Sequence, residues 1–175
     1  MTAAPNLPLG PLTLQDVTAL AAADDQHRYE LTEGNLIVMP PPTWRHQRIS
    51  ARLLIWLDQK FGERVNTAPG METADDERSG RVPDLVVTTE DIPPDDTVWL
   101  SAAMVLLAVE IVSPGSERTD RWFKPVEYAE VGIEHFWRVE PDDVVLRFQL
   151  VDGAYKEIGR DPLDTLLAGE VPELD

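Results

Sequence analysis

The chain has 175 residues, of which 43% are hydrophobic and 27% are charged, a composition typical of one globular domain with a single core. It contains no cysteine, which excludes a disulfide framework, a thiolate metal site and a cysteine nucleophile. The formal net charge of −17 repels polyanions, and it therefore argues against tight, non-specific binding of DNA.

Hydrophobic periodicity and turn residues predict two helices and a hairpin in the N-terminal part. Residues 13–23 form the first predicted helix, with a threonine as its N-cap. Strands over 29–31 and 36–39 then flank a glycine turn, and the three prolines after the second strand end it. The strongest helix pattern covers 43–61, where apolar residues recur at three- and four-residue steps and a glycine follows.

The central part of the chain supplies the predicted core strands. Residues 66–80 are polar and predict a strand edge followed by a loop. A short strand over 84–88 precedes an acidic, proline-rich loop over 90–96. The run 104–112 is apolar on both faces, which favours a central strand that is covered from both sides.

A further helix and more strands are predicted in the C-terminal part. The helix covers 119–131, with Thr119 as its cap. The strands that follow it cover 133–139, 144–151 and 154–158. The acidic tail from Asp161 is expected to lie on the surface. The whole pattern predicts one layered α/β domain over 1–175, with its core from about residue 12 to 160 and helices on the faces of a mixed sheet.

Export and membrane insertion are not indicated by the sequence. The first ten residues have neither the basic start nor the long apolar run of a signal peptide. No segment approaches the roughly 18 unbroken apolar residues that a membrane span needs. We therefore expect a cytoplasmic protein without a membrane partner.

Two acidic residues at the ends of apolar strands are the most informative feature of the sequence. Asp84 begins one strand, and Glu110 lies inside the apolar run that forms the next. A buried carboxylate without a partner costs several kcal/mol, and two carboxylates on neighbouring strands are suitable ligands for Mg²⁺ or Mn²⁺. The structural alternative is a strand-end carboxylate paired with an arginine and a second one that caps a turn. The pattern alone does not decide between them.

A family resemblance extends this interpretation over most of the chain, from about residue 12 to 140. The similarity rests on Tyr29-Glu30-Leu31-Thr32-Glu33-Gly34, Met39-Pro40-Pro41-Pro42, His46, Pro83-Asp84, Val109-Glu110-Ile111-Val112-Ser113-Pro114-Gly115-Ser116, Asp120, Lys124, Tyr128-Ala129, Gly132-Ile133 and Phe136-Trp137. The resemblance on these residues is to the Uma-two family of bacterial "putative restriction endonucleases". It implies the α/β restriction-endonuclease-like fold of the PD-(D/E)XK nucleases. In this fold a mixed central β-sheet is flanked by helices, here with an N-terminal helix and β-hairpin, and a divalent-metal site lies at one edge.

The resemblance assigns catalytic roles to three residues. Asp84 matches the aspartate of the Pro-Asp signature, and Glu110 matches the acidic residue of the second motif. The lysine that usually follows two positions later is absent, because Val112 stands there. The resemblance implies that Lys124 on the next helix replaces it. Asp120 lies four residues earlier on the same helix face and can pair with Lys124, although a plain surface ion pair is the alternative.

Auxiliary roles are weighed for residues on the hairpin and the long helix. Glu30 matches an acidic residue that the superfamily often supplies as a metal or water ligand, but it is equally consistent with a strand-edge carboxylate. His46 is a candidate base, although a lone histidine on this helix face is more often a satisfied core residue, and the resemblance raises the catalytic interpretation slightly. Arg45, Arg48 and Arg52 form a stripe that could contact phosphates, although such stripes are usually solvated faces.

The sequence therefore predicts an endonuclease that depends on Mg²⁺ or Mn²⁺ and hydrolyses phosphodiester bonds, with DNA as the expected partner. Asp84, Glu110 and the carbonyl of Ile111 would hold the metal ion. Lys124 would stabilise the phosphate or help to deprotonate water. The main alternative is a catalytically inactive interaction module, favoured by the net charge and by Val112. A metal-dependent hydrolase of another substrate is a third hypothesis, and a homodimer is expected.

Overall fold

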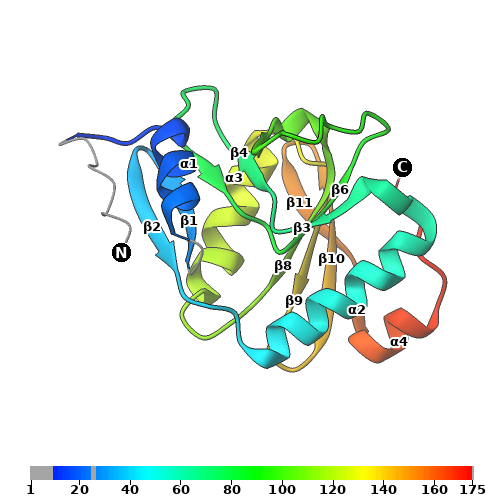
Figure 1. The fold of residues 1–175 in the computed structure, drawn as a ribbon. Coiled ribbons are helices and arrows are strands. Elements are labelled where there is room, and N and C mark those ends of the chain that lie inside the picture. The colour runs from blue at the N-terminus through cyan, green and yellow to red at the C-terminus, as the bar shows by residue number, and fades with distance from the viewer. Residues whose placement is uncertain (1–9, 25–26, 175) are drawn as a thin grey trace.

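Two mixed β-sheets, built by the described residues 10–24 and 27–174, form the frame of the molecule in this computed structural model (Figure 1). The larger sheet has the order β11 (Ala154–Pro162), β10 (Val144–Val151), β9 (His135–Val139), β8 (Val105–Ile111), β6 (Leu85–Thr88) and β3 (Val65–Thr67). The smaller sheet has the order β2 (Asn35–Met39), β1 (Arg28–Thr32), β5 (Gly80–Arg81), β4 (Gly70–Glu72) and β7 (Trp99–Leu100). The expected class, a mixed α/β fold, is confirmed, but the hairpin belongs to the smaller sheet and not to the larger, central one.

The N-terminal elements form where capping and turn residues predict them. Helix α1 (Leu14–Ala23) begins with a capping box, in which Thr13 and Asp16 each accept a hydrogen bond from the other's backbone N–H. The turn between β1 and β2 uses Glu33 and Gly34, both with positive φ, as two-residue hairpins require. The expectation about a signal peptide concerns residues 1–10, and nearly all of these lie outside the described part.

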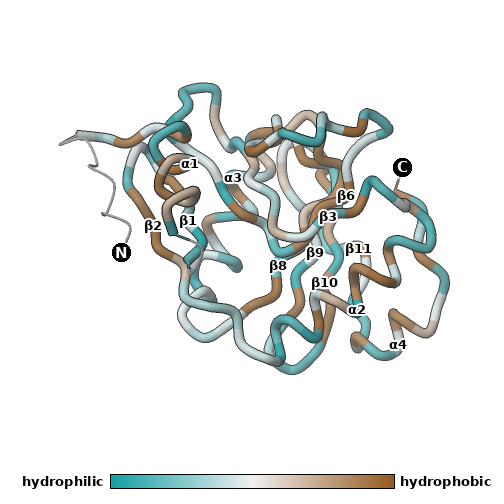
Figure 2. The backbone as a smooth tube through the Cα atoms, in the orientation of Figure 1, coloured by the Kyte–Doolittle hydropathy of each residue, from teal (hydrophilic) through white to brown (hydrophobic). Residues whose placement is uncertain are grey.

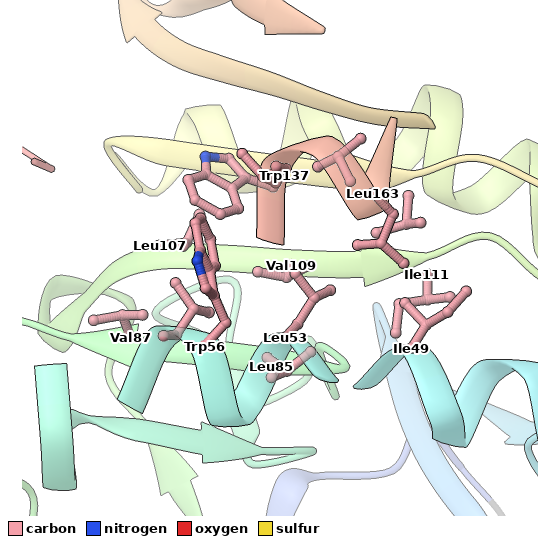
Figure 3. Close-up of a cluster of buried hydrophobic side chains, with 14 residues drawn as sticks. Ile49, Leu53, Trp56, Leu85, Val87, Leu107, Val109, Ile111, Trp137 and Leu163 are labelled. Atoms are coloured by element: carbon pink, nitrogen blue, oxygen red, sulfur yellow. The ribbon is translucent and has the colours of Figure 1, made fainter. Parts of the chain in front are cut away.

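Helix α2 (Trp44–Phe61) covers one face of the larger sheet and encloses its main core (Figure 3). Hydrophobic and hydrophilic residues alternate along it in Figure 2, as expected for a helix with one buried side. Its Leu53 and Leu57 are fully buried, and Trp56 packs against Trp137 of β9 with ring centroids 6.1 Å apart. Within the described ranges, no helix is long and apolar enough to cross a membrane.

Several short or C-terminal elements differ from the prediction. The segment 66–80, expected to be a strand edge and a loop, also contributes β4 and β5 to the smaller sheet. Strands of two or three residues are too short to show alternation, so the sequence pattern missed them, as it missed β7. The surface tail expected from Asp161 is wrong as well. Strand β11 continues to Pro162, and helix α4 (Leu163–Ala168) buries Leu163 in the main core.

The helical segment after β8 begins earlier than predicted, and Thr119 is not its cap. The helix starts at Glu117, and Asp120 N donates to the carbonyl of Ser116. Residues Thr119–Phe123 form a π-helical turn, η3, and helix α3 (Lys124–Glu130) continues from it. Pro125 has no N–H to donate, and the widened turn accommodates it inside a continuous helical segment.

Strand pairing brings the two predicted acidic residues to the same end of the larger sheet. Strand β6 is antiparallel to β8, with Leu85 opposite Val109, so Asp84 before β6 lies beside the last residues of β8. Asp84 N donates to the carbonyl of Val109 over 3.0 Å, and Ile111 N donates to Asp84 Oδ2 over 2.7 Å. The fold therefore positions Asp84 and Glu110 together through backbone contacts.

Candidate active site

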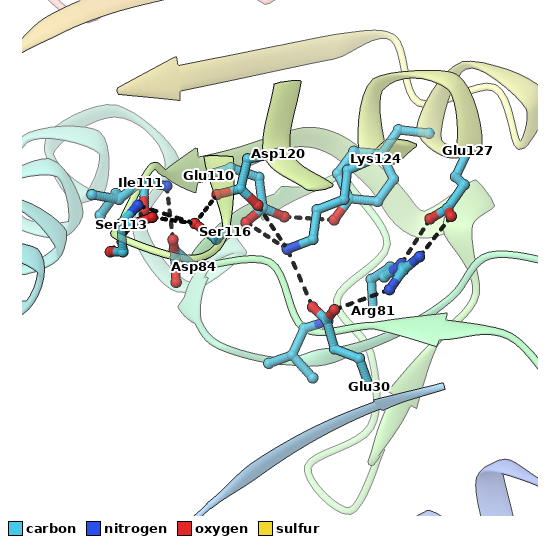
Figure 4. A network of polar contacts seen from close by, with 12 residues as sticks. Glu30, Arg81, Asp84, Glu110, Ile111, Ser113, Ser116, Asp120, Lys124 and Glu127 are labelled. Atoms are coloured by element: carbon cyan, nitrogen blue, oxygen red, sulfur yellow. Dashed lines mark hydrogen bonds and ion pairs between the residues drawn. The ribbon is translucent and has the colours of Figure 1, made fainter. Parts of the chain in front are cut away.

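Lys124 lies at the centre of a buried network of carboxylates (Figure 4). Its Nζ is 2.9 Å from Glu110 Oε2 of β8, 3.2 Å from Glu30 Oε1 of β1 and 3.5 Å from Asp120 Oδ1 of η3. The lysine side chain is only 2% exposed. One ammonium group thus joins both sheets and the helical segment between β8 and β9.

Burial and the charges of this network raise the pKa of Glu110, and the carboxylates keep Lys124 charged. Burial raises the pKa of Glu110 well above its usual value, and the carboxylates of Asp120, Asp84 and Glu30 add to it, although Lys124 opposes them. Burial alone would lower the pKa of Lys124, but Glu110, Glu30 and Asp120 together raise it well above its usual value. Lys124 is therefore an ammonium ion at any physiological pH.

Tyr128 holds the second oxygen of Glu110. The Tyr128 hydroxyl donates to Glu110 Oε1 over 2.6 Å, one helical turn beyond Lys124, so two residues of α3 bind the two oxygens of one carboxylate. Burial and the neighbouring Glu110 raise the pKa of the Tyr128 hydroxyl, which therefore remains a donor. The pair fixes the orientation of Glu110.

Glu30 is anchored from the opposite side by Arg81. Arg81 Nη1 donates to Glu30 Oε2 over 3.1 Å, and its other nitrogens bind both oxygens of Glu127 on α3. Burial raises the pKa of Glu30, but Lys124, Arg81 and the backbone N–H of Val82 outweigh it and hold this pKa below its usual value. Glu30 is thus a carboxylate that fixes Lys124 in place.

Asp84 lies beside this network and carries its own partners. His46 Nε2 of α2 is 2.9 Å from Asp84 Oδ1, and a guanidinium nitrogen of Arg28 is 3.8 Å from the same oxygen. The buried Nδ1 of His46 has no hydrogen-bond partner among the described residues, so Nε2 is the nitrogen that donates. His46 and the Ile111 N–H together hold the Asp84 carboxylate from two sides.

Asp120 links the network to the loop after β8. Its side chain is buried and accepts a hydrogen bond from Ser116 Oγ, which itself accepts from the backbone N–H of Ser113. Burial raises the pKa of Asp120, while Lys124 and the Ser116 hydroxyl oppose that effect. The serine-proline-glycine-serine loop therefore has a defined shape where it borders the site.

These groups border one cavity of about 380 Å³ between the hairpin, the start of α2 and η3. The catalytic and auxiliary candidates predicted from the sequence all line it: Glu30, His46, Asp84, Glu110, Asp120 and Lys124. Ile111 lines it too. The structure thus brings together residues that are as far apart in the chain as Glu30 and Lys124.

The arginine stripe on α2 does not belong to the lining of this cavity. Arg45 donates to the Glu140 carbonyl and pairs with Asp143, and Arg52 pairs with Asp164 of α4. These two side chains tie α2 to the C-terminal elements, and Arg48 is exposed. Contact with phosphates stays a prediction for all three.

Sequence reasoning missed the roles of Tyr128 and Arg81. Tyr128 follows Lys124 at a four-residue step, so the two share a helix face, and this spacing could have indicated a common partner. Arg81 lies in a two-residue strand that the pattern did not predict. Its role depends on the tertiary contact between β5 and α3.

The donor set suits a hard divalent cation, although the ligands are few. Glu110, Asp84 and the Ile111 carbonyl offer oxygen atoms, which are the ligand type of Mg²⁺ and Mn²⁺. Besides burial, the neighbouring carboxylates raise the pKa of Glu110, and a bound cation would offset their negative charge. Among the described residues, no three histidine, aspartate or glutamate side chains are grouped as metal ligands. Any ion would therefore be completed by backbone, water or substrate oxygens.

Mixed sheets flanked by helices, with two acidic residues at the strand ends and a lysine beside them, define a restriction-endonuclease-like α/β protein. The chain belongs to the Uma2 family, described as "putative restriction endonuclease", whose family model matches residues 14–174. It is similar to the crystal structure of a putative nuclease of DUF820 from Anabaena variabilis, with a TM-score of 0.67 and 20% identity over 84% of each chain. At that identity the likeness concerns the fold. No curated protein matches the chain.

Proposed function

We propose that the protein is a nuclease that requires Mg²⁺ or Mn²⁺ and hydrolyses phosphodiester bonds in nucleic acid. The observation that carries the proposal is the contact of Lys124 with Glu110, 2.9 Å apart at a cavity that Asp84 also lines. The family and the fold support the nuclease class. Asp84, Glu110 and the Ile111 carbonyl would hold the cation, which supplies Lewis-acid charge to a phosphodiester and acidifies water.

Lys124 supplies positive charge rather than a proton acceptor in this proposal. Its raised pKa keeps the ammonium protonated, which excludes it as a base for water at neutral pH. An ammonium beside the cavity stabilises the charge that develops on the phosphate oxygens. Glu30 and Arg81 hold this group in place, and His46 orients Asp84.

An inactive interaction module is the second candidate, and a specific observation favours it. Both oxygens of Glu110 and both oxygens of Asp84 already have partners within the chain. A carboxylate that is satisfied in this way gains less from a metal ion. The melting temperature and DNA cleavage measured with Mn²⁺ separate the two candidates.

Mn²⁺-dependent stabilisation and cleavage test the proposal together. Millimolar Mn²⁺ should raise the melting temperature of the wild type, because a ligand of the folded state stabilises it, and should permit cleavage of labelled DNA. Asp84→Asn and Glu110→Gln should each abolish both effects. Asp91→Asn, at an exposed loop acid outside the cavity lining, is the matched control and should behave as the wild type. Equal shifts in all four proteins, without cleavage, would favour the inactive module.

Three further expectations accompany the proposal. DNA is the expected nucleic-acid partner, the chain is expected to form one domain over 1–175, and a cytoplasmic location is expected. Self-association to a homodimer is a separate prediction. Light scattering that reports only the 19.6 kDa of one chain at high protein concentration would contradict it.

A further inference from the structure

We infer that the cavity receives an unpaired nucleotide, so that single-stranded nucleic acid is the substrate class of this site rather than an intact duplex. The inference rests on the proposed nuclease function and specifies its substrate. Three features of the cavity carry it: the depth of its charged floor, the apolar character of one wall, and the scarcity of cationic side chains around it.

The groups that would act on a phosphate lie too deep for a duplex to reach. Glu30, Glu110, Asp120 and Lys124 are each 1–2% exposed, and they line a cavity of about 380 Å³, the size of a small-molecule pocket. Base pairing holds the phosphates of a duplex in a regular array on its outside, and bending a short site by 40–90° costs about 1–6 kcal/mol, so a phosphate reaches such a pocket only if the duplex is deformed. A single strand can turn one nucleotide inward without breaking base pairs. Enzymes that act on a base in a duplex must first extrude it, which costs unpairing and unstacking energy.

One wall of the cavity suits a nucleobase. In the β1–β2 hairpin, Ile37 lies directly opposite Glu30 and Met39 opposite Arg28, so both apolar side chains share the face that carries the acidic floor. Each of them is partly exposed, and both line the cavity. The wall continues through Pro40, Pro41, Pro42 and Pro114. A base laid against this wall would bury one of its faces on apolar side chains, with its phosphate directed towards Lys124.

Charge makes a duplex partner unfavourable here. Among the described residues that line the cavity, the lysine and arginine side chains are Lys124 and Arg28. Lys124 is already surrounded by carboxylates, and the whole chain carries a charge of −17. Duplex binding depends largely on many neutralised phosphates, whereas an unpaired base also offers its own faces for contact. Affinity must therefore come mainly from the apolar wall.

Binding to labelled DNA, measured by fluorescence anisotropy in EDTA, tests the inference directly. The probes are a mixed-sequence 20-nucleotide single strand and the same strand annealed to its complement. We expect the single strand to bind about tenfold more tightly or better. The slope of log K against log salt should be no steeper than about −1.4, the value for two phosphate contacts on a single strand.

Variants of the apolar wall separate this inference from a general charge effect. Ile37→Glu should weaken single-strand binding by about tenfold or more, and the milder Ile37→Ser should weaken it less, because both remove apolar contact with the base. Ile92→Glu adds the same charge at an exposed apolar residue outside the cavity lining and should bind as the wild type. Circular dichroism of each variant checks that the fold is kept, and Ile37→Ser serves if Ile37→Glu unfolds.

The outcomes also distinguish this inference from the nuclease proposal. Mn²⁺-dependent cleavage of the duplex but not of the single strand overturns the inference and leaves the nuclease proposal intact. Tight single-strand binding without any cleavage supports the ligand class and contradicts the nuclease. A third outcome is that Ile37→Glu converts a dimer into a monomer of 19.6 kDa without changing DNA binding. The wall would then be an interface between two copies of the chain, and the inference would be wrong.

Discussion

Replacement of Lys124 by methionine should destabilise the protein strongly. Among the described residues, Lys124 is the only cation that contacts all three of Glu30, Glu110 and Asp120. The three carboxylates are within 2.9–3.5 Å of the lysine Nζ. Methionine has a similar length, so the packing volume is largely kept and the lost charge dominates. Breaking a buried ion pair by removing one partner costs about 3–5 kcal/mol, because an uncompensated charge stays behind.

This loss corresponds to a fall in melting temperature of about 6–20 °C, since 1 kcal/mol shifts a domain of this size by about 2–4 °C. Thermal and urea unfolding, followed by circular dichroism at pH 7, measure it. The difference between variant and wild type should shrink as the pH is lowered, because the abandoned carboxylates take up protons and lose their mutual repulsion. Burial already raises the pKa of Glu110 and of Asp120, so this recovery should begin at mildly acidic pH.

Lys60→Met is the matched control for this experiment. Lys60 pairs with Glu173 near the surface, where its side chain is 27% exposed, so its loss should cost less than about 1 kcal/mol. A Lys124→Met variant no less stable than Lys60→Met would refute the reasoning. It would mean that the acidic residues around Lys124 are neutral at pH 7 and that the ammonium does not hold the network together.

The other predictions concern the support of the site and of the core. Tyr128→Phe removes the donor to Glu110 Oε1 and should cost about 1–3 kcal/mol in urea unfolding while the far-ultraviolet spectrum is unchanged; an unchanged midpoint would contradict the contact. Burial raises the pKa of Glu140, but its two arginine partners outweigh this effect, so the pKa in the folded state lies below the usual 4.5. A carboxylate with a lowered folded pKa stabilises above its unfolded value and loses that contribution as the pH falls. The destabilisation by Glu140→Gln should thus be present at pH 7 and fade below about pH 4.5, and a destabilisation that instead grows as the pH falls from 7 to 4 would contradict the assignment. Leu163→Ala, at a buried residue of α4, should cost about 2–5 kcal/mol, and a smaller loss than 1 kcal/mol would show that α4 is not part of the core.

The elements that could be predicted from the sequence are those with strong local signals. The capping residue Thr13, the turn at Gly34 and the apolar face of α2 depend on neighbours within a few residues, which the sequence displays directly. Asp84 and Glu110 could be paired because Asp84 begins one apolar strand and Glu110 lies near the end of the next, and such strands become adjacent and buried.

The rest depends on contacts that the sequence does not display. Arg81 looks like a loop residue until the fold brings Glu30 and Glu127 to its two sides. Helix α4 lies within an acidic stretch that resembles a surface tail, and its packing against α2, β10 and β11 explains why it forms. The π-helical turn before Lys124 cannot be seen in periodicity, because its five residues make about one turn and are too few to reveal a change of period.

The most direct measurement of the central claim is a crystal of the wild type soaked in Mn²⁺, with anomalous difference density calculated at the metal edge. The proposed function predicts a peak bound by the Asp84 and Glu110 carboxylates and the Ile111 carbonyl, with the Lys124 ammonium beside it. The same soak of Glu110→Gln should show no peak there. The absence of an anomalous peak between Asp84 and Glu110 in the wild type, with both carboxylates keeping their present protein partners, would contradict a metal-dependent nuclease at this site.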